Sequence, residues 1–269
     1  MQRPDLPADF LTRPLAHRAL HGPGRPENST AAVMAAVAAG YGLEIDIQGS
    51  ADGAAMVFHD ATLDRMTDAT GRVRARTAAE LGAIALKGGD GAGIPTLAEV
   101  LALVAGRVPL LIEIKDQTRG QGGGDDALER AAAAALAGYD GPVAVMSFSP
   151  LPIAAMARLA PAVPRGLVTY PFPLDEFPEA RGQPEAEARL RDLAAIAHFD
   201  AVGASFISHD HRDLDRPRVA ELKGQGVPVL CWTIRSAQEE ERARRIADNV
   251  TFENYLPARA GAAGRRAAG

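Results

Sequence analysis

Glu44 and Asp46 stand two residues apart in the run LEIDI, in which every neighbouring residue is apolar. On a strand, this spacing directs both carboxylates to one face and the apolar side chains to the other. Two such residues, about 7 Å apart, can direct oxygens onto one hard cation at roughly 2.0–2.6 Å, as Mg²⁺ or Ca²⁺ requires. The pair therefore predicts a metal site, although an exposed strand edge or pairing with basic residues fits this motif alone equally well.

The run PLLIEIKD repeats the arrangement, with Glu113 and Lys115 on one face of another predicted strand. Glu113 adds a third carboxylate to the expected cation site. Lys115 would bring a fixed positive charge beside it, which suits a substrate that carries a negative phosphoryl group. A simple ion pair between Glu113 and Lys115 is the alternative for this motif taken alone.

Two histidines lie at predicted strand ends, His17 in LAHRAL and His59 in MVFHDATLDR. Because imidazole titrates near neutrality, such a pair on opposite sides of a phosphodiester could act as general base and general acid. Arg18 offers a planar fork of donors to phosphate oxygens. A lone histidine is more often structural, and we expect that role for His21, His198, His209 and His211, although the last two could rim the site.

The elements that would position these residues follow a strand and helix alternation along the chain. Such alternation is typical of repeated βα units around a parallel sheet, and no G-x-G-x-x-G motif follows a strand as in many open doubly wound sheets. We therefore predict an α/β fold of the TIM (β/α)8 barrel type. The eight predicted strands are Leu15–Arg18, Leu43–Gln48, Pro109–Lys115, Val143–Phe148, Gly166–Tyr170, Ala201–Phe206, Val227–Thr233 and Val250–Glu253.

Helical patterns fill the intervals between the strands and end at Gly, Pro or Asp. About sixty residues separate the second strand from the third, which exceeds a normal βα loop and predicts a small insertion at about residues 50–95. The insertion holds an extended piece, Met56–His59, and a helix over Ala78–Ile84. The other predicted helices are Ser29–Ala39, Thr96–Val104, Ala127–Leu136, Ile153–Leu159, Glu185–His198 and Ala237–Ile246.

The composition favours one domain. A chain of 269 residues with 47% hydrophobic residues can bury a full core, so we expect a single barrel domain over residues 1–258 and a disordered basic tail at 259–269. A net charge of -5 gives no electrostatic reason to bind nucleic acid or an anionic membrane. The chain shows no signal peptide or membrane span, and the single Cys231 is expected to be a buried filler, which together favour the cytoplasm.

The ordered motifs resemble the glycerophosphodiester phosphodiesterase family. That family carries H-R on the first strand, then P-E-N, E-x-D on the second strand, H-D, E-x-K on the third and W-T near the seventh. Each element is weak by itself, whereas the ordered series spans most of the chain. Here the series reads His17-Arg18, Pro26-Glu27-Asn28, Glu44-Ile45-Asp46, His59-Asp60, Glu113-Ile114-Lys115 and Trp232-Thr233.

Several positions depart from the family pattern. The usual H-R-G reads His17-Arg18-Ala19 and is followed by an extra His21, W-T-x-N ends in Arg235, and the last strand reads TFENYLP in place of T-D-x-P. The metal, histidine and lysine positions are unchanged. The departures therefore bear on the alcohol group of the substrate rather than on the reaction.

The resemblance implies metal-dependent hydrolysis of glycerophosphodiesters to glycerol 3-phosphate and an alcohol. It implies one divalent cation, Mg²⁺ or Ca²⁺ with Mn²⁺ as a third candidate, on Glu44, Asp46 and Glu113. Arg18 and Lys115 would bind the phosphate, with His17 as base and His59 as acid. Glu27 would orient Arg18, Asn28 would cap the following helix, and Trp232 would form an apolar wall for the glycerol carbons unless it is a core tryptophan.

Two other functions fit the same residues. A lysophospholipase D or sphingomyelinase D-like enzyme would need an exposed apolar rim, which Tyr170, Phe172 and Phe177 in TYPFPLDEFP could supply. A non-catalytic barrel that binds phosphodiesters would have no use for two proton-carrying histidines. The sequence identifies neither the metal, nor the alcohol, nor the oligomeric state.

Overall fold

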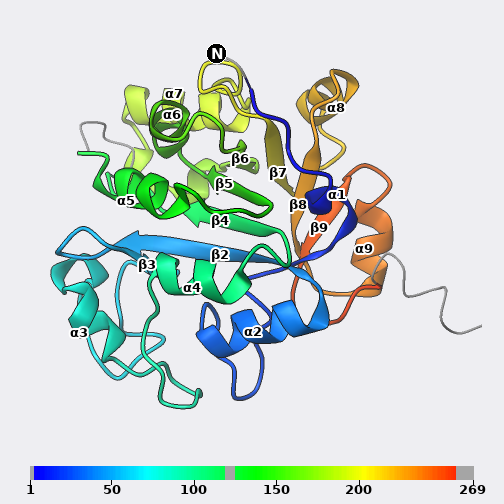
Figure 1. Cartoon of the computed structure of the whole chain (residues 1–269). Helices are drawn as coiled ribbons and strands as arrows, with labels where there is room; N and C mark the ends of the chain where they lie inside the picture. Colours follow the sequence, from blue (N-terminus) through cyan, green and yellow to red (C-terminus); the bar gives the residue numbers. More distant parts are fainter. Residues whose placement is uncertain (1–2, 119–124, 259–269) are drawn as a thin grey trace, which may run out of the picture.

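In the part of the chain that the computed structural model describes, residues 3–118 and 125–258, eight parallel strands close into a barrel inside a ring of helices (Figure 1). Neighbouring barrel strands follow the chain order, and the barrel closes because β1 pairs with both β9 and β2. The predicted TIM barrel is therefore confirmed. The barrel strands are β1 (Leu15–Ala16), β2 (Gly42–Gly49), β4 (Leu110–Ile114), β5 (Val143–Ser147), β6 (Arg165–Thr169), β7 (Phe206–Asp210), β8 (Val229–Ile234) and β9 (Asn249–Phe252).

Polar caps begin the helices that cover the barrel. Ser29 accepts a hydrogen bond from the backbone of Ala32 at the start of α2, and Thr96 with Glu99 forms a capping box at the start of α4. In Figure 1 these two helices lie side by side along β2. The helices are α1 (Asp9–Thr12), α2 (Thr30–Ala39), α3 (Ala78–Gly82), α4 (Leu97–Val104), α5 (Ala127–Leu136), α6 (Pro150–Leu159), α7 (Pro184–Ala194), α8 (Pro217–Gly224) and α9 (Ala237–Ala243), with 3-10 turns η1 (Val73–Ala75), η2 (Leu174–Glu176) and η3 (Pro178–Ala180).

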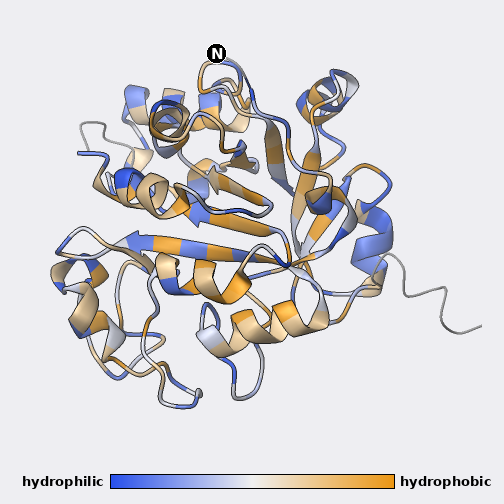
Figure 2. Cartoon of the chain, viewed as in Figure 1, coloured by the Kyte–Doolittle hydropathy of each residue, from blue (hydrophilic) through white to orange (hydrophobic). Residues whose placement is uncertain are grey.

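Alternating side chains on β2 fix the direction of its carboxylates. Leu43, Ile45 and Ile47 are fully buried in the layer between the sheet and the helices, and Figure 2 shows the alternation as polar and apolar bands along the strand. Burial of one such side chain stabilises the fold by about 1.5–3 kcal/mol, so a register shift of one residue would be costly. Glu44 and Asp46 consequently point toward the barrel interior.

The segment between β2 and β4 packs against the barrel beside β2. Its strand β3 (Ala55–Val57) pairs antiparallel with β2, and η1 and α3 follow. Apolar side chains of this segment form a separate buried cluster. Directly after β3, Phe58 donates a hydrogen bond from its N–H to the carbonyl of Asp46 (3.0 Å), and the side chain of Gln48 donates one to the carbonyl of His59 (2.9 Å). These bonds hold His59 beside the carboxyl end of β2.

The position predicted for the sixth barrel strand is wrong. Apolar residues over Ala201–Phe206 suggested a strand, whereas the strand is Phe206–Asp210. Val202 and Ala204 are buried in the preceding loop, where the carbonyl of Val202 accepts a hydrogen bond from Arg165 and Gly203 has a positive φ of 61°. Smaller differences are that α7 ends at Ala194 rather than His198, that α9 ends at Ala243 rather than Ile246, and that α1 and α8 were not predicted.

Three predictions made from the composition can be compared with the structure. Cys231 is buried as expected, and burial raises the pKa of its thiol to about 12, so it is inert as a nucleophile near neutral pH. No helix among the described residues is long and apolar enough to cross a membrane. The tail predicted to be disordered, residues 259–269, lies outside the described residues.

Candidate active site

Glu44, Asp46 and Glu113 come together inside the carboxyl end of the barrel. Asp46 on β2 stands opposite Glu113 on β4 in the strand register. One carboxylate oxygen from each of the three residues lies within 4.8 Å of the other two, and all three residues are buried. The sequence alternative of an exposed strand edge does not hold, and the three carboxylates share one interior position.

Lys115 joins this cluster from the end of β4. Its Nζ lies 2.6 Å from Asp46 Oδ1 and also forms an ion pair with Glu113. Burial alone would lower the pKa of Lys115, but the carboxylates of Asp46 and Glu113 raise it well above its usual range. The ion pair considered for Glu113 and Lys115 therefore exists, and it includes Asp46 as well.

The negative charge of Glu44 is disfavoured both by burial and by the neighbouring carboxylates. Burial raises its pKa well above the usual value, and the charges of Asp46 and Glu113 raise it further. A hydrogen bond from the backbone N–H of Arg18 to Glu44 Oε2 (2.9 Å) opposes this only in part. Buried carboxylates in excess of their cationic partners are what a divalent ion with hard oxygen ligands would neutralise. The donor set therefore fits a divalent cation such as Mg²⁺ or Ca²⁺.

Asn28 orients Asp46 instead of capping α2. Its side chain donates a hydrogen bond to Asp46 Oδ2 (2.8 Å) and accepts one from the backbone of Asp46 (3.2 Å). The positive φ of Asn28, 58°, turns the residue away from the helix, and Ser29 serves as the cap. The predicted cap at Asn28 is wrong because the next residue satisfies the helix end, which leaves the amide free to hold the carboxylate.

Arg18 reaches toward the same carboxylates from the end of β1. Its Nη1 donates to Glu27 Oε1 (3.0 Å), as predicted for an orienting glutamate, and its Nε lies 3.7 Å from Asp46 Oδ2. Within the described residues this Nε is buried without a hydrogen-bond partner. An unpaired buried donor of this kind costs free energy unless a ligand satisfies it, and a phosphate oxygen is a suitable acceptor.

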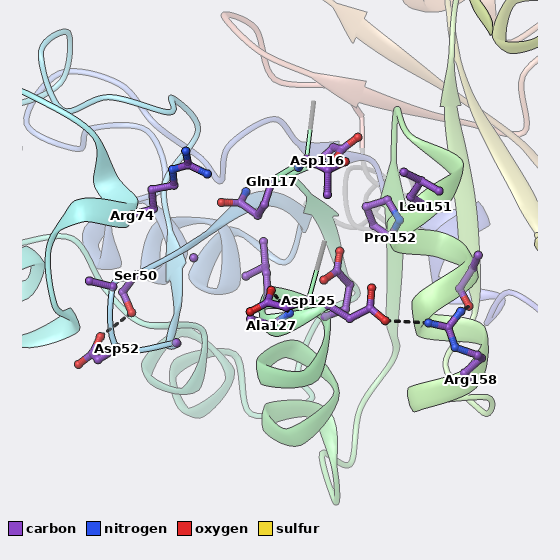
Figure 3. Close-up of a pocket in the computed structure, with 18 residues that line it drawn as sticks. Ser50, Asp52, Arg74, Asp116, Gln117, Asp125, Ala127, Leu151, Pro152 and Arg158 are labelled. Atoms are coloured by element: carbon purple, nitrogen blue, oxygen red, sulfur yellow. Dashed lines mark hydrogen bonds and ion pairs between the residues drawn. The ribbon is translucent and has the colours of Figure 1, made fainter. Parts of the chain in front are cut away.

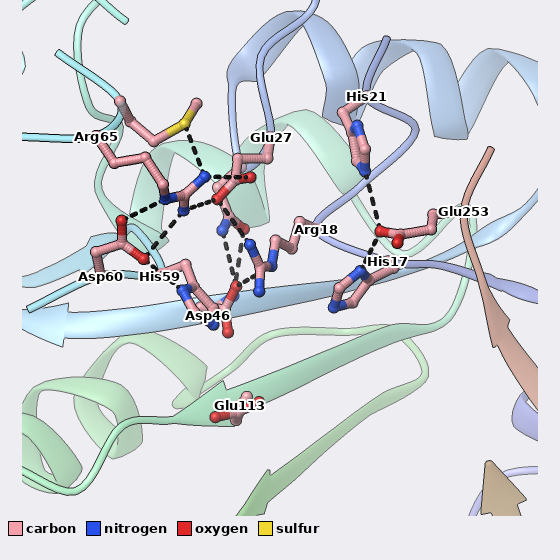
Figure 4. A network of polar contacts seen from close by, with 12 residues as sticks. His17, Arg18, His21, Glu27, Asp46, His59, Asp60, Arg65, Glu113 and Glu253 are labelled. Atoms are coloured by element: carbon pink, nitrogen blue, oxygen red, sulfur yellow. Dashed lines mark hydrogen bonds and ion pairs between the residues drawn. The ribbon is translucent and has the colours of Figure 1, made fainter. Parts of the chain in front are cut away.

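His59 is held by a chain of charged residues from the segment after β3 (Figure 4). Its Nδ1 lies 2.7 Å from Asp60 Oδ1, Arg65 donates to both Asp60 and Glu27, and Glu27 in turn holds Arg18. Burial lowers the pKa of His59, with nearby Asp46 acting in the opposite direction. Arg65 was not predicted from sequence, although it stands in the same turn-rich run as His59.

His17 is held by a residue from the other end of the chain. Its Nδ1 lies 2.7 Å from Glu253 Oε2 (Figure 4). The other oxygen of Glu253, Oε1, accepts a hydrogen bond from Arg235 (2.7 Å). His21, predicted to be structural, lies 3.6 Å from the same Oε2. The hydrogen bond with His17, together with the nearby imidazole of His21, holds the pKa of Glu253 well below its usual range. The departures noted in the sequence thus gather around His17, and Glu253 is a site residue that the sequence analysis missed.

Trp232 lies among aromatic residues at the carboxyl end of the barrel. Its ring meets Phe148 edge-on at 5.4 Å and Tyr170 at 6.2 Å, and its indole N–H donates to the carbonyl of Ser208 (2.9 Å). The side chain is half-buried and packs against the cluster inside the barrel. Both predicted roles for Trp232 remain consistent with this position.

His209 does not rim the site. Its side chain is completely buried on β7, where Nδ1 lies 2.7 Å from Thr169 Oγ1 and Nε2 lies 3.2 Å from Asp213 Oδ2. Burial lowers its pKa, which favours the neutral ring, and both nitrogens have internal partners. His209 is a structural histidine, as the first expectation for it stated.

An apolar hollow of about 690 Å³ opens next to the carboxylate cluster. Glu113 and Lys115 stand at its edge, and its walls are mainly aromatic and aliphatic. The side chains that make it apolar are Phe148, Tyr170, Phe172, Phe177, Leu190 and Leu193.

A second hollow of about 640 Å³ has mixed walls that include several charged side chains (Figure 3). It shares Asp116 and Leu151 with the apolar hollow, so the two are neighbours. Its lining includes Ser50, Asp52 and Arg74 from the segment after β2. The end of β4 is thus flanked by one mainly apolar hollow and one with mixed walls.

The fold and the site together define a phosphodiesterase built on a TIM barrel. The model of the Glycerophosphoryl diester phosphodiesterase family matches residues 17–251, and the chain belongs to this family.

Known proteins agree with this assignment. The chain is 27% identical over 249 residues to the putative glycerophosphodiester phosphodiesterase YhdW of Bacillus subtilis, which covers 90% of this chain and 93% of that protein. It is 40% identical over 97 residues to a glycerophosphodiester phosphodiesterase of Caldanaerobacter subterraneus, a match that covers 34% of this chain and 40% of that protein.

Solved structures agree in fold. A phosphodiesterase of Oleispira antarctica, determined in complex with the product sn-glycerol-3-phosphate, superposes with a TM-score of 0.71 at 24% identity, covering 90% of this chain and 93% of the other. A putative glycerophosphoryl diester phosphodiesterase of Silicibacter pomeroyi gives a TM-score of 0.72 at 23% identity and covers 91% and 93%. The insertion after β2 therefore sits on a barrel of known type.

Proposed function

We propose that this chain catalyses metal-dependent hydrolysis of glycerophosphodiesters to glycerol 3-phosphate and a free alcohol. The observation that carries the proposal is the buried convergence of Glu44, Asp46 and Glu113 within 4.8 Å of one another, next to Lys115 and Arg18. A small-molecule substrate also agrees with the Oleispira antarctica phosphodiesterase, which was solved with sn-glycerol-3-phosphate. A cytoplasmic location remains a prediction from the sequence.

Glu44, Asp46 and Glu113 would hold one divalent cation, Mg²⁺ or Ca²⁺, with Mn²⁺ also suited to oxygen ligands. When bound, such a cation polarises phosphoryl oxygens and lowers the pKa of a glycerol hydroxyl or water bound to it. Asn28 contributes by fixing the carboxylate of Asp46 through two hydrogen bonds. Glu44 is fixed in turn by the backbone N–H of Arg18.

Arg18 and Lys115 supply the positive charge that a phosphodiester needs. The buried Nε of Arg18 would donate to a phosphoryl oxygen, while Nη1 stays on Glu27. Lys115 would exchange part of its contact with Asp46 or Glu113 for the substrate. Both donors are fixed before the reaction, so they stabilise charge that grows on phosphorus oxygens at little reorganisation cost.

His17 and His59 would move the protons. Glu253 accepts from Nδ1 of His17, which leaves Nε2 to take the proton of the attacking hydroxyl, and the carboxylate stabilises the imidazolium that results. As the bond between the attacking oxygen and phosphorus forms, the bond to the leaving alcohol breaks. If the attacking oxygen is that of water, the product is glycerol 3-phosphate, and if it is that of the glycerol hydroxyl, water then opens the cyclic phosphate to the same product. His59, held through Nδ1 by Asp60, would give its proton to that leaving oxygen. Two held proton carriers also argue against a barrel that only binds phosphodiesters.

The apolar hollow favours a second candidate substrate for the same reaction, a lysophospholipid or a related lipid phosphodiester, as in the lysophospholipase D or sphingomyelinase D-like alternative. Phe148, Phe172 and Phe177 line this hollow, and Glu113 and Lys115 lie at its edge. An apolar group attached to the phosphate could therefore be buried there. Burial of each methylene would contribute about 0.8 kcal/mol to binding.

A turnover assay tests the proposal. Release of glycerol 3-phosphate should be measured for glycerophosphodiesters with hydrophilic alcohols, and release of the free head-group alcohol for lysophospholipids, whose phosphate product keeps the acyl chain. Both should be measured with and without added Mg²⁺ or Ca²⁺. We expect metal-dependent release from the first group, and no release from any member would refute the proposed function. For the second candidate, Phe177→Ala should raise KM for lysophospholipids alone. Leu174→Ala, which changes an exposed side chain of the same segment, is the matched control.

A further inference from the structure

A second group of metal-ligating side chains lies beside the carboxylate cluster. His17 follows β1, His21 lies in the loop before α2, and Glu253 follows β9. Both imidazoles lie close to one carboxylate oxygen. His17 Nδ1 is 2.7 Å and His21 Nε2 is 3.6 Å from Glu253 Oε2. One ligand atom from each residue lies within 4.8 Å of the other two. The side chains are 19%, 25% and 14% exposed, so an ion can reach them from solvent.

Ligand chemistry separates this group from the carboxylate cluster. Two imidazoles and one carboxylate are a donor set that Zn²⁺ uses, with bonds of roughly 2.0–2.2 Å in a tetrahedral arrangement. In such a tetrahedron neighbouring ligand atoms are about 3.3 Å apart. The observed separations of 2.7 and 3.6 Å lie on either side of that value. An oxygen-only cluster such as Glu44, Asp46 and Glu113 instead suits Mg²⁺ or Ca²⁺.

The three ligands are already held in place by their surroundings. Arg235 donates to Glu253 Oε1 (2.7 Å), which leaves Oε2 for the histidines. The backbone N–H of each ligand residue donates a hydrogen bond to a backbone carbonyl. These bonds are His17 to Phe252 (2.9 Å), His21 to Ala19 (2.9 Å) and Glu253 to Ile234 (3.0 Å). Partners outside the ligand shell of this kind orient the ligands and raise metal affinity. An ion would therefore need little rearrangement of the chain.

We propose that His17, His21 and Glu253 bind one Zn²⁺ ion and that this ion switches off His17. Zinc on Nδ1 of His17 leaves the ring proton on Nε2, so the imidazole can donate but can no longer accept a proton. The reaction then loses its base while the carboxylate cluster keeps its own cation. The inhibitory part rests on the proposed function, whereas zinc binding does not.

Zinc binding is tested without substrate. Isothermal titration with ZnCl₂ in excess Mg²⁺ should be compared between the intact protein, His21→Ala and His211→Ala. His211 is a half-buried histidine whose charged neighbours are Asp210, Glu239, Arg212 and Arg235. We expect His21→Ala to lose one zinc-binding event or to weaken it by roughly tenfold or more, and His211→Ala to retain it. Equal number and affinity of zinc ions in His21→Ala and the intact protein would overturn the proposal.

Inhibition is tested by turnover at saturating Mg²⁺. Low zinc should inhibit the intact protein and His211→Ala, while His21→Ala should keep its activity until zinc is roughly tenfold higher. Equal zinc sensitivity of all three would assign inhibition to the carboxylate cluster and overturn the switch. His21→Gln, checked by circular dichroism, guards against a folding defect. If zinc binds as expected but the zinc-free protein turns over no glycerophosphodiester, the proposed function fails while the zinc site stands.

Discussion

His17 Nδ1 and Glu253 Oε2 lie 2.7 Å apart, although 236 residues separate them in the chain. The pairing of β1 with β9 closes the barrel and brings the two strand ends together. Arg235 holds the other oxygen of Glu253, so the carboxylate has one orientation toward the imidazole. The arrangement gives Glu253 the geometry of a residue that positions a catalytic base.

Glu253→Gln should lower kcat and leave KM nearly unchanged, because the change loosens the proton carrier without touching the phosphate-binding groups. The loss should not exceed that of His17→Ala, which general base catalysis limits to roughly 10²–10⁴. The decisive measurement is the double variant, which should be no slower than His17→Ala alone because both changes remove one function. Additive losses would show that Glu253 acts elsewhere. Glu241→Gln, a highly exposed glutamate, is the control.

Glu44→Gln should abolish metal binding and turnover but stabilise the metal-free protein. Burial raises the pKa of Glu44, so as pH rises above about 4.5 the unfolded chain loses this proton before the folded chain does, and folding weakens. The glutamine removes that penalty. Thermal unfolding should therefore give a higher Tm for the variant than for the intact protein in a chelator.

Adding Mg²⁺, Mn²⁺ or Ca²⁺ should then raise the Tm of the intact protein alone, since a ligand that binds only the folded state stabilises it. Chelation should abolish activity and one of these ions should restore it. Full activity after exhaustive chelation, with no metal in elemental analysis, would refute the metal assignment.

Lys115→Met should lower kcat by roughly 10² or more, the loss expected when one preorganised donor to a transition state is removed. Methionine matches the four-atom aliphatic part of the lysine side chain but leaves Asp46 and Glu113 without their ammonium partner. The metal-free variant should therefore be less stable as well. Kinetics at saturating metal separate the two effects, and an unchanged rate there would make Lys115 a structural ion-pair partner.

The sequence predicted those parts of the site that lie on regular strands. Alternation of charged and apolar residues places Glu44, Asp46, Glu113 and Lys115 correctly because a strand has a fixed two-residue period. The same reasoning failed at β7, where Ser208, His209 and Asp210 are buried polar residues that break the apolar pattern.

Partners that depend on barrel closure or on a single turn were not predictable in the same way. Asn28 was interpreted as a cap because nothing in the sequence reveals its positive φ. Glu253 could have been found, because it is the last residue of the predicted strand Val250–Glu253 and the carboxyl ends of all barrel strands meet at one face. The contact of Glu253 with His17 could not have been found from the sequence, because this contact depends on which side chains meet across the pair of strands that closes the barrel.

The pH dependence of turnover should report His59. Burial lowers its pKa below the usual 6.5, with Asp46 opposing this and Lys115 adding to it. A general acid works in its protonated form, so kcat/KM should fall as pH rises through that lowered pKa, on the acid side of neutrality. Profiles from about pH 5 to pH 8 should show this fall in the intact protein and lose it in His59→Ala. The same fall in His59→Ala would assign it to another group.

The two histidines can be separated by the leaving group of the substrate. If His59 protonates the leaving alkoxide, His59→Ala should cost roughly 10² to 10⁴ in rate with an ordinary glycerophosphodiester. The loss should be much smaller with a nitrophenyl phosphodiester, because nitrophenolate leaves without a proton. His17→Ala should harm both substrates about equally, since the attacking hydroxyl is the same. If the nitrophenyl substrate instead rescues His17→Ala and not His59→Ala, the roles are reversed. If it rescues neither variant, proton transfer to the leaving group is the wrong account of both residues, and the pairs with Glu253 and Asp60 then hold the imidazoles for binding rather than for acid and base catalysis.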